Sequence, residues 1–514
     1  MPSIKRVLIS VTDKTGIVAF ARKLSELSVD IVSTGGTANL LRDTGIPVRD
    51  VADVTGFPEM LDGRVKTMHP KITGGILAIR DNPTHMQALA THEIQAIDMV
   101  VVNLYQFEKV AAKAGAALSE LMENIDIGGP TMIRSAAKNY QDVAVVVSPD
   151  DYDAILEEMA GSGGSISSET CWKLARKAFQ TTADYDRAIS TRLSTELQHS
   201  ALQNSALPPT LDIRAPKRMD LRYGENPHQS AALYGSSSVG IAGAEQAQGK
   251  ELSYNNLVDL DAAWLLVNEF AGPAAVIVKH TNPCGCAEQQ TLAESYRKAL
   301  ECDPISAFGG VIGFNREVDE ETAAEVVKTF IEAIAAPGYS AAALAKFGAK
   351  KNLRLVKVAP SADRLVVKSI SGGYLAQTPD TQQEATRAGQ VSTHRAPTED
   401  EWIALEFAWK VAKHVKSNAV VYARAGQTVG IGAGQMSRVD AVRIGASKAV
   451  LPLPGTVIGS DAFFPFPDGV EEAARHGITA VIQPGGSVKD GEVIEAANRL
   501  GLAMVFTGTR HFRH

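Results

Sequence analysis

One stretch of the chain runs Ala274-Ala275-Val276-Ile277-Val278-Lys279-His280-Thr281-Asn282-Pro283-Cys284-Gly285-Cys286. Its first five residues are apolar and rich in β-branched side chains, a pattern typical of a buried strand. A cation, an imidazole and a turn of Pro and Gly follow at once. Open α/β sheets carry their chemistry just beyond the carboxyl ends of strands. We therefore expect an α/β fold with Lys279 and His280 at a catalytic centre. The alternative is a structural Lys-His pair at a strand end.

The same alternation of β-rich runs and helical patterns extends to both sides of this stretch. Downstream, we expect strands at 310–314, 419–423, 429–431, 480–483 and 504–507, and helices near 260–270, 320–333, 399–414 and 438–448. Upstream, we expect strands at 7–11, 30–33, 75–79, 99–104 and 143–147, with a helix at 16–27. Strands separated by helices predict a doubly wound parallel sheet for residues 1 to about 160.

The length of the chain predicts more than one domain, because a single core stops growing at roughly 250–300 residues and this chain has 514. A long helical pattern at 169–197 is followed by a Pro-containing stretch at 199–217, which is typical of a linker. We expect two domains, 1–199 and 200–514. The second is long enough to hold two subdomains. No short-period repeat is apparent.

Composition argues against several classes of protein. Apolar residues make up 45% of the chain and charged residues 21%, as in ordinary globular proteins. The net charge of −7 removes the usual electrostatic reason to expect nucleic-acid binding. No apolar run approaches a membrane span, and four cysteines are too few for a secreted disulfide framework. We expect a cytoplasmic protein with neither nucleic acid nor membrane as a partner.

A glycine-rich turn in the first domain is a candidate phosphate cradle. The residues Ser33-Thr34-Gly35-Gly36-Thr37 follow a predicted strand and open a helix. There, glycine permits close approach of the backbone, and free helix N–H groups face an anion. Lys14 lies just past the first strand and adds a cation. The P-loop spacing is missing, and a tight structural turn is the alternative reading.

Three further fragments are expected at the carboxyl edge of the first sheet. Two cations, a hydroxyl and an imidazole occur within Arg64-Val65-Lys66-Thr67-Met68-His69-Pro70, and Asn103-Leu104-Tyr105 ends a strand. Asp126-Ile127-Gly128-Gly129-Pro130 leads into a helix that carries Arg134 and Lys138 on one face. Each fragment alone is explained by a solvated loop or a cap. Together they favour a site.

The second domain contains polar and aromatic clusters of the same kind. The residues Leu221 to Gln229 are polar and turn-rich, and an Arg with a Tyr can clamp a phosphate and stack on a base. Ser306 to Gly310 brings an aromatic ring and glycines to a strand start, and Asn418, Gln435 and Arg438 flank two strands. The run Asp461 to Phe466 is the densest aromatic segment, explained either by core packing or by a wall for a flat ligand.

Cys284 and Cys286 raise the question of a zinc site. Nucleobase deaminases combine an H-x-E motif with P-C-x-x-C. Here the two cysteines are separated by one residue rather than two, and the residue two after His280 is Asn282, not Glu. Both the ligand count and the general acid/base are missing. The motif therefore argues against a zinc-dependent deaminase, and we expect no catalytic metal.

Six ordered motifs resemble the bifunctional purine-biosynthesis family that joins an IMP cyclohydrolase to a transformylase of AICAR, 5-aminoimidazole-4-carboxamide ribotide. The resemblance spans both domains essentially end to end. The motifs are Ser10-Val11-Thr12-Asp13-Lys14-Thr15-Gly16, Ser33-Thr34-Gly35-Gly36-Thr37, Arg64-Val65-Lys66-Thr67-Met68-His69-Pro70, Leu221-Arg222-Tyr223-Gly224-Glu225-Asn226-Pro227-His228-Gln229, Val278-Lys279-His280-Thr281-Asn282-Pro283 and Ser460-Asp461-Ala462-Phe463-Phe464-Pro465-Phe466.

The resemblance implies a methylglyoxal-synthase-like N-terminal domain and two cytidine-deaminase-like α/β subdomains that have lost their zinc. It implies formyl transfer from 10-formyltetrahydrofolate to AICAR, giving formyl-AICAR, and then dehydrative ring closure to IMP. It also implies a homodimer with transformylase sites at the subunit interface. The main alternative is an N-terminal domain that only senses a nucleotide and is attached to a transformylase.

For the cyclohydrolase, the resemblance implies ribotide-binding and catalytic residues in the first domain. Lys66 would stabilise the oxyanion, and Tyr105, Asp126 and Lys138 would move protons. Ribotide-binding residues would be Ser10, Lys14, Thr34, Gly36, Thr37, Arg64 and Thr67.

For the transformylase, the resemblance makes His280 the base, because a pKa near 6.5 leaves much of an imidazole neutral at pH 7. Lys279 would stabilise the oxyanion or protonate the leaving nitrogen, and Asn418 would orient His280. AICAR would be held by Arg222, Tyr223 and Arg510, and the folate side lined by Phe308, Gly309, Arg438, Phe463, Asp468 and Ser487. The chain departs from the family pattern at Pro467, where Arg is expected, and at Gln106, where Pro is common.

Overall fold

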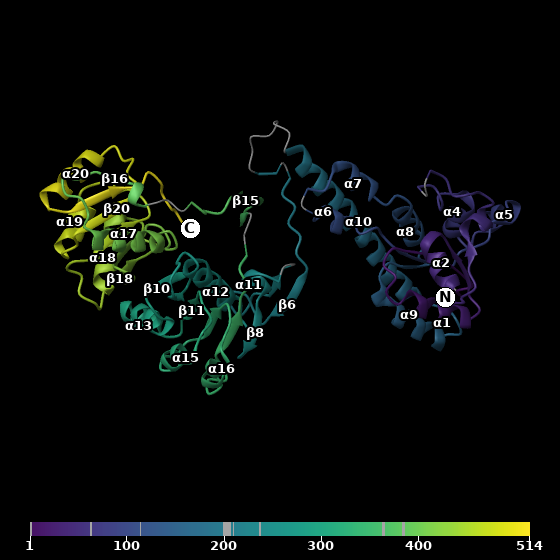
Figure 1. Cartoon of the computed structure of the whole chain (residues 1–514), viewed down its shortest axis with the longest axis horizontal. Helices are drawn as coiled ribbons and strands as arrows, with labels where there is room; N and C mark the ends of the chain where they lie inside the picture. The colour runs from purple at the N-terminus through teal and green to yellow at the C-terminus, as the bar shows by residue number, and fades with distance from the viewer. Residues whose placement is uncertain are drawn as a thin grey trace. The chain divides into compact units, whose positions relative to one another are not determined.

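The computed structural model describes residues 3–61, 64–113, 115–198, 207–208, 210–235, 238–361, 365–382 and 386–514. The chain divides into two compact units, Met1–Ser205 and Ala206–His514. The domain boundary expected at 199/200 and the first part of the expected linker lie outside the described residues. Figure 1 shows the first unit in purple to blue and the second in teal to yellow.

The first unit is built on a five-stranded parallel sheet in the order β3-β2-β1-β4-β5. The strands are β1 (Arg6–Val11), β2 (Asp30–Ser33), β3 (Arg49–Asp50), β4 (Met99–Asn103) and β5 (Ala144–Val146). Strand order reverses at β1, so successive crossovers cover opposite faces and leave a crevice beyond the carboxyl ends of β1 and β4. The expected doubly wound parallel sheet is confirmed.

Helices cover this sheet. α8 contacts β4 and β5, α10 packs on α8 and β5, and α1 packs on β2 and α9. The helices are α1 (Ile17–Glu26), α2 (Gly35–Asp43), α3 (Val51–Thr55), α4 (Pro70–Leu77), α5 (Pro83–Thr91), α6 (Phe107–Ala111), α7 (Leu118–Glu123), α8 (Gly128–Lys138), α9 (Tyr152–Gly161) and α10 (Ser168–Gln198).

The strand expected at 75–79 is wrong, because most of this segment belongs to α4. Pro70 occupies the first turn of that helix, and Nδ1 of the preceding His69 accepts a hydrogen bond from the Lys71 backbone at 3.1 Å. Gly75 lets the helix approach its neighbour, since a Cβ there would lie 2.5 Å from the Gln95 carbonyl oxygen. A short apolar run fits a helix or a strand, and here the cap decides.

The second unit is built on one twelve-stranded mixed sheet in the order β16-β21-β20-β19-β17-β18-β10-β9-β11-β12-β13-β8. The strands are β8 (Glu245–Gln248), β9 (Ala274–Lys279), β10 (Asn282–Glu288), β11 (Val311–Phe314), β12 (Ala333–Ala336), β13 (Arg354–Lys357), β16 (Gln390–Val391), β17 (Val420–Arg424), β18 (Gln427–Gly432), β19 (Val457–Ser460), β20 (Ala480–Gln483) and β21 (Ala503–Phe506). Two separate hairpins pair β6 (Lys217–Leu221) with β7 (Ala231–Tyr234) and β14 (Val366–Ile370) with β15 (Gly373–Gln377).

Two helices of the second unit differ in their bounds from those that the sequence patterns predicted. α12 starts at Tyr254 behind a capping box at Ser253, earlier than expected, and α15 ends at Val326, so Ala333 opens β12 instead of ending a helix. The helices are α11 (Gly240–Gly243), α12 (Tyr254–Val267), α13 (Leu292–Cys302), α14 (Pro304–Ala307), α15 (Glu320–Val326), α16 (Ala341–Phe347), α17 (Glu399–Ala412), α18 (Arg438–Lys448), α19 (Asp468–Arg475) and α20 (Asp490–Arg499).

This sheet consists of two halves with the same order of elements, joined where β10 pairs with β18 through Ala287 and Gln427. Each half starts with an edge strand, β8 or β16, and a 14-residue helix behind a capping box, α12 or α17. It continues through an antiparallel hairpin into an 11-residue helix, α13 or α18. Gly313 of β11 approaches the backbone of α12 as Gly459 of β19 approaches that of α17. The repeat is long, which is why a search for short periods did not find it.

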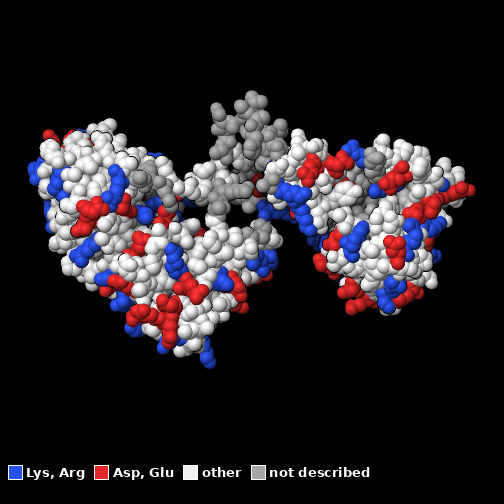
Figure 2. All heavy atoms as spheres, in the orientation of Figure 1, with Lys and Arg blue, Asp and Glu red and all other residues white. Residues whose placement is uncertain are grey.

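The surface of both units is of mixed charge. On the face shown in Figure 2, cations and anions alternate over each unit. No helix among the described residues is long and apolar enough to cross a membrane.

Two candidate active sites

A cavity of about 920 Å³ lies beyond the carboxyl ends of β1 and β4 in the first unit. It is lined by ten of the residues that the sequence assigned to the cyclohydrolase, which come from several separate segments. These residues are Ser10, Lys14, Thr34, Gly36, Thr37, Arg64, Lys66, Thr67, Tyr105 and Asp126. The topology explains the convergence, because the ends of neighbouring parallel strands meet at one edge.

One wall of this cavity is the start of α2. Thr34 is the N-cap, and its side chain makes no capping bond. Lys14 Nζ donates to Thr37 Oγ1 at 2.6 Å and to the Val11 carbonyl, which holds the ammonium beside the first turn of the helix. Burial lowers the pKa of Lys14. Helix N–H groups and a partly desolvated ammonium form a site suited to an anion such as a phosphate.

Lys66, Tyr105 and Asp126 also line the cavity, and Lys66 Nζ lies close to the start of α2, 3.7 Å from where a Cβ at Gly35 would be. Burial raises the pKa of Asp126, and hydrogen bonds from the Gly129 and Tyr105 backbones and the charge of Lys66 oppose that rise. Burial also raises the pKa of the Tyr105 phenol, and the nearby Asp126 carboxylate adds to this shift. A carboxyl with a raised pKa next to a phenol and an ammonium is an arrangement suited to proton transfer.

The Asp126 segment is held from two sides. Gly129 donates its backbone N–H to Asp126 Oδ1 at 2.8 Å, and a Cβ at Gly129 would lie 2.5 Å from Asp126 Oδ2, so only glycine permits this approach. Tyr185 of α10 accepts the Asp126 backbone N–H at 2.8 Å and donates to the Asn124 carbonyl at 3.2 Å. Tyr185 also packs against Phe107 in a small separate core. The sequence analysis did not identify Tyr185, which belongs to no motif.

Lys138 is not brought to this cavity. It is the exposed last residue of α8, roughly 15 Å along the helix from Gly128 at 1.5 Å per residue. Arg134, on the same face, lies over the Phe179 ring of α10 at 5.6 Å. The shared face of these two cations is therefore directed towards α10, whereas the cavity lies at the other end of α8.

Asn103 is a lining residue that the sequence analysis placed at the strand end without a role. Its Oδ1 accepts the backbone N–H groups of Thr12 and Asp13 at 2.6 and 2.9 Å, and its Nδ2 donates to the Asp13 carbonyl at 3.1 Å. These bonds fix the loop that carries Lys14. Gly128 and the apolar Met122, Ile125, Ile127 and Met132 also belong to the lining.

In the second unit, most of the predicted transformylase residues lie at one edge of the twelve-stranded sheet. Strands β9, β18 and β19 end at this edge, β11 and β17 begin there, and β20 and β21 run parallel to β19. The residues next to these strand ends are Lys279, His280, Phe308, Gly309, Asn418, Arg438, Phe463, Asp468, Ser487 and Arg510.

Lys279 and His280 line a pocket of about 420 Å³ together with Asn282, Gln435 and Lys448. Lys279 ends β9, and its Nζ donates to the Phe308 carbonyl at 2.9 Å. His280 and Thr281 form the two-residue tip of the β9–β10 hairpin, and both have positive φ, 53° and 61°. The imidazole thus sits on a tightly turned backbone at the mouth of the pocket.

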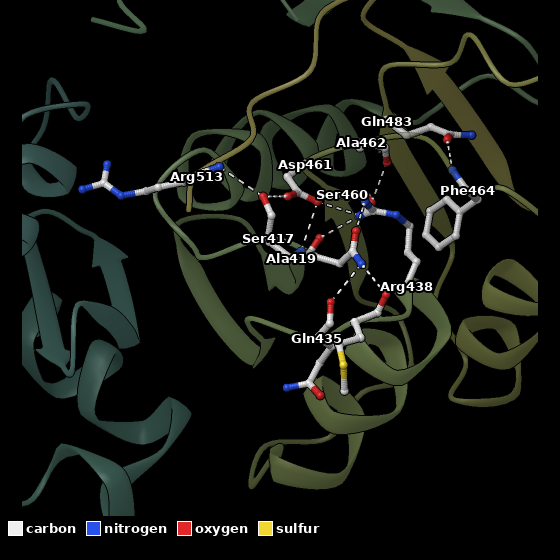
Figure 3. Close-up of polar contacts among 12 residues, drawn as sticks. Ser417, Ala419, Gln435, Arg438, Ser460, Asp461, Ala462, Phe464, Gln483 and Arg513 are labelled. Carbon is white, nitrogen blue, oxygen red and sulfur yellow. Dashed lines mark hydrogen bonds and ion pairs between the residues drawn. The ribbon is translucent and has the colours of Figure 1, made fainter. Parts of the chain in front are cut away.

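A network of polar contacts joins Ser417, Asp461 and Arg438 (Figure 3), and Arg438 also binds Asn418. Arg438 Nη2 donates to Asn418 Oδ1 at 2.7 Å, while its Nη1 pairs with Asp461 Oδ1 at 2.6 Å. Asn418 Nδ2 donates to the Gln435 and Met436 carbonyls at 2.9 and 3.2 Å. Both amide hydrogens are therefore used, and Oδ1 keeps one free acceptor site. Arg438 is 6% exposed and binds Asn418. In the structure it therefore holds Asn418, whereas the sequence analysis expected it to line the folate side of the site.

The other predicted residues lie apart from the Lys279 pocket. Arg222 lines a separate pocket of about 230 Å³, and its guanidinium lies 4.8 Å from the centroid of the Tyr223 ring. Arg510 is exposed and covers Phe512 at 4.7 Å. Pro467 forms the N-cap of α19, directly before the exposed Asp468, so no cation occupies that position. One chain does not gather these residues around Lys279 and His280.

The cysteines of β10 are free thiols, of which Cys286 is buried and Cys284 is partly buried. Burial raises the pKa of Cys284 to about 12 and that of Cys286 well above its usual value. Within the described ranges, no group of three or more His, Cys, Asp or Glu side chains is placed to hold a metal ion.

Comparison with known proteins adds family matches to this geometry. A family model described as "AICARFT/IMPCHase bienzyme" matches residues 136–448, more than half of the chain. A model described as "MGS-like domain" matches residues 16–131. A solved structure titled "Crystal structure of ForH" is 35% identical, and the match covers 37% of this chain and 100% of that one with a TM-score of 0.35.

Proposed function

The chain belongs to the AICARFT/IMPCHase bienzyme family and catalyses the last two steps of IMP synthesis; from this premise we propose that each reaction has its own site. The cavity of the first unit closes the ring, and the sheet edge of the second unit transfers the formyl group. The observation that carries this assignment is the gathering of Lys14, Lys66, Tyr105 and Asp126 in one cavity, separate from the Lys279-His280 pocket.

In the first site, the phosphate of formyl-AICAR binds at the start of α2, with Lys14 as its counter-cation. The carboxamide nitrogen then attacks the formyl carbon of the same molecule, and water leaves. Because both groups belong to one molecule, the protein mainly has to fix the reactive conformer and stabilise developing charge. Lys66 faces the oxyanion, and Asp126 with Tyr105 moves the protons. The proposal gives no step to Lys138, because α8 directs it away.

A nucleotide sensor in place of a cyclohydrolase would need only the phosphate cradle. The raised pKa of Asp126 beside Lys66 and Tyr105 has no purpose in such a sensor. This cluster, together with the family membership, favours catalysis over the regulatory alternative.

In the second site, the amine of AICAR attacks the formyl carbon of 10-formyltetrahydrofolate, and the folate nitrogen leaves. His280 takes the proton from the amine, and Lys279 stabilises the tetrahedral oxyanion or protonates the leaving nitrogen. The free acceptor site of Asn418 Oδ1 receives one N–H of His280 in the loaded site, which leaves the other ring nitrogen unprotonated as the base. Arg438 acts through Asn418, which is a change from the lining role predicted for it.

We assign the remaining predicted binding residues from their motifs and from their positions near the sheet edge. Phe308, Gly309, Phe463, Asp468 and Ser487 belong to the folate side of this proposal. Arg222, Tyr223 and Arg510 belong to the AICAR side. Arg222 lines a different pocket from Lys279. We therefore propose that Arg222, Tyr223 and Arg510 of one chain act with Lys279 and His280 of a partner copy.

A homodimer is supported by an exposed hairpin. The β14–β15 hairpin displays Ile370, Tyr374 and Leu375, which are 48%, 65% and 58% exposed, and in Figure 1 it stands away from the sheet of its unit. An isolated two-stranded ribbon is at best marginally stable in water, and exposed apolar patches mark interfaces. Light scattering should give twice the chain mass, and Leu375→Glu should lower both the dimer fraction and formyl transfer. A fully active monomer would contradict this part.

The reactions are placed in the cytoplasm. All four cysteines are free in the structure, as expected in a reducing compartment.

A coupled assay tests the assignment of donor and product. The protein is supplied with AICAR and 10-formyltetrahydrofolate, and IMP is measured by chromatography. IMP should appear only when both compounds are present. Formation of IMP from AICAR with free formate in place of the folate, at an equal rate, would refute the folate donor.

A further inference from the structure

The hairpin tip that carries His280 has an unusual backbone. Lys279 pairs with Asn282, so His280 and Thr281 form a two-residue loop in which both φ angles are positive. Such loops normally contain Asn and Gly, because a Cβ is disfavoured in this region and a β-branched residue such as Thr is an outlier there. Non-glycine residues persist in this conformation only when surrounding groups hold them.

Asp259 of α12 supplies that support. Its Oδ2 accepts the backbone N–H of His280 at 3.2 Å, and its Oδ1 accepts that of Thr281 at 2.7 Å. One carboxylate therefore binds both left-handed residues, and bonds from N–H to an ionised acceptor are among the stronger hydrogen bonds in proteins. Asp259 belongs to none of the sequence motifs assigned above.

The internal repeat offers a natural comparison. The equivalent hairpin of the other half pairs Arg424 with Gln427, and its tip is Ala425-Gly426, where the glycine carries the positive φ of 67°. Asp259 is the sixth residue of α12, and the sixth residue of α17 is the buried Ala404. The half without the histidine thus has glycine at the tip and alanine, not a carboxylate, at the equivalent position of the helix.

We propose that Asp259 is a positioning residue that holds the His280-Thr281 turn in its strained conformation and so aims the imidazole at the attacking amine of AICAR. The inference rests on the proposed role of His280 as the transformylase base. Asp259 acts through these two bonds to backbone N–H groups. A further hydrogen bond supports the same turn, because Asn282 Oδ1 accepts the Lys416 backbone N–H at 3.0 Å and links the tip to the segment that leads to Asn418.

The test measures formyl transfer and cyclisation in the full-length chain carrying Asp259→Ala or Asp259→Asn. Misplacing a catalytic group by about 1 Å costs on the order of 100-fold, so Asp259→Ala should lower kcat of transfer by about 10- to 100-fold and leave the KM values for both substrates within about twofold. Asp259→Asn should lose less, because one acceptor oxygen remains. Cyclisation should be unchanged in both, which also reports that the protein is folded. Glu321→Ala, which removes an exposed carboxylate of α15, is the matched control and should leave both reactions unchanged.

A rescue separates positioning from a general structural role. Thr281→Gly removes the backbone strain at the tip, so adding it to Asp259→Ala should recover at least about threefold of the lost kcat. Wild-type transfer in Asp259→Ala would overturn the inference, and so would a loss that appears only in KM or that Thr281→Gly does not relieve. His280→Ala distinguishes the two proposals. If His280→Ala keeps transfer activity, the assignment of His280 as the base fails. If His280→Ala loses transfer activity while Asp259→Ala keeps it, only the positioning role of Asp259 is refuted.

Discussion

The two candidate sites differ in how completely one chain assembles them. In the first unit, ten predicted residues from separate segments line one cavity of about 920 Å³. In the second, Lys279 and His280 share a pocket of about 420 Å³, while Arg222 lines another and Arg510 is exposed. One chain thus gathers most of the residues predicted for the first site, whereas the residues predicted for the second lie in separate places.

This difference follows the chemistry of the two reactions. Ring closure has one substrate, whose nucleophile and electrophile are already joined, so a single enclosure can hold it. Formyl transfer brings two large substrates together and needs a base, which favours a long edge that a second copy of the chain can complete. The predictions below separate the two sites, starting with the largest expected effect.

Removing the imidazole of His280 should have the largest effect. General base catalysis contributes about 10²- to 10⁴-fold, so His280→Ala should slow formylation of AICAR by that factor. The rate is measured from loss of 10-formyltetrahydrofolate. The control is His476→Ala, which removes another imidazole of the same unit and should leave the rate unchanged. Comparable rates for the two variants would reassign His280 to structure.

Removing the ammonium of Lys66 should have the next largest effect, on the other reaction. Loss of one preorganised oxyanion partner costs about 10²- to 10³-fold, so Lys66→Ala should slow cyclisation of formyl-AICAR by that amount, followed as IMP formation. Lys23→Ala, at an exposed ion pair on α1, is the matched control. An undiminished rate in Lys66→Ala would place the oxyanion elsewhere in the cavity.

Changing the Arg438 guanidinium, which binds Asn418, should have a moderate effect on formyl transfer alone. Arg438→Lys keeps a cation for Asp461, but one ammonium cannot also reach Asn418 in the bidentate manner of a guanidinium. We expect a loss of about tenfold in kcat of transfer, the equivalent of one charge-assisted hydrogen bond. Arg443→Lys, an exposed pair on the same helix, should be neutral. If Arg438→Lys and the wild-type chain transfer the formyl group at the same rate, Arg438 serves stability only.

The Tyr185 hydroxyl should have a smaller effect, confined to the first unit. Tyr185→Phe removes the acceptor of the Asp126 backbone N–H and should cost about 1 kcal/mol of unfolding free energy, with a few-fold loss of cyclisation. Denaturant unfolding and the cyclisation assay measure the two effects. A loss of stability with full cyclisation would limit Tyr185 to packing.

The smallest effect is a displacement of the pH profile. Burial raises the pKa of Asp126, so its carboxyl becomes protonated at a pH above the ordinary value of 3.8. Because the folded state binds this proton more tightly than the unfolded state, the contribution of Asp126 to stability falls as the pH rises through this range. If Asp126 accepts a proton in catalysis, the rate of cyclisation should fall as the pH is lowered. The midpoint of this acid limb should lie above pH 3.8. Asp126→Asn should lack that limb, and retention of the same limb would assign it to another group.

The sequence predicted those features that depend on local pattern. The strand at 7–11 and the helix at 438–448 follow from periodicity and flanking polar residues, and both are present as β1 and α18. The segment 75–79 was assigned to the wrong state, because GILAI is too short a run for periodicity to separate a helix from a strand. The helix start that settles it, with His69 as the N-cap and Pro70 in the first turn, lies outside the run.

Features that depend on packing could not be predicted from pattern. Lys138 has the right residue type and lies close in sequence to Asp126, yet the length of α8 carries it away from the cavity. Asp259 and Tyr185 touch backbone groups that are distant in sequence, and a carboxylate or a tyrosine on a helix has no distinguishing signal. The long repeat was also hidden, since its two halves share element lengths and glycine contacts more than residue identities.

The central claim is that one chain carries two separate active sites. The most direct test is to measure both reactions in both variants, His280→Ala and Lys66→Ala, each with formyl-AICAR or with AICAR and 10-formyltetrahydrofolate. The account predicts that His280→Ala cyclises formyl-AICAR at the wild-type rate but forms it slowly, and that Lys66→Ala forms formyl-AICAR at the wild-type rate but closes it slowly. Parallel loss of both reactions in either folded variant would contradict the claim.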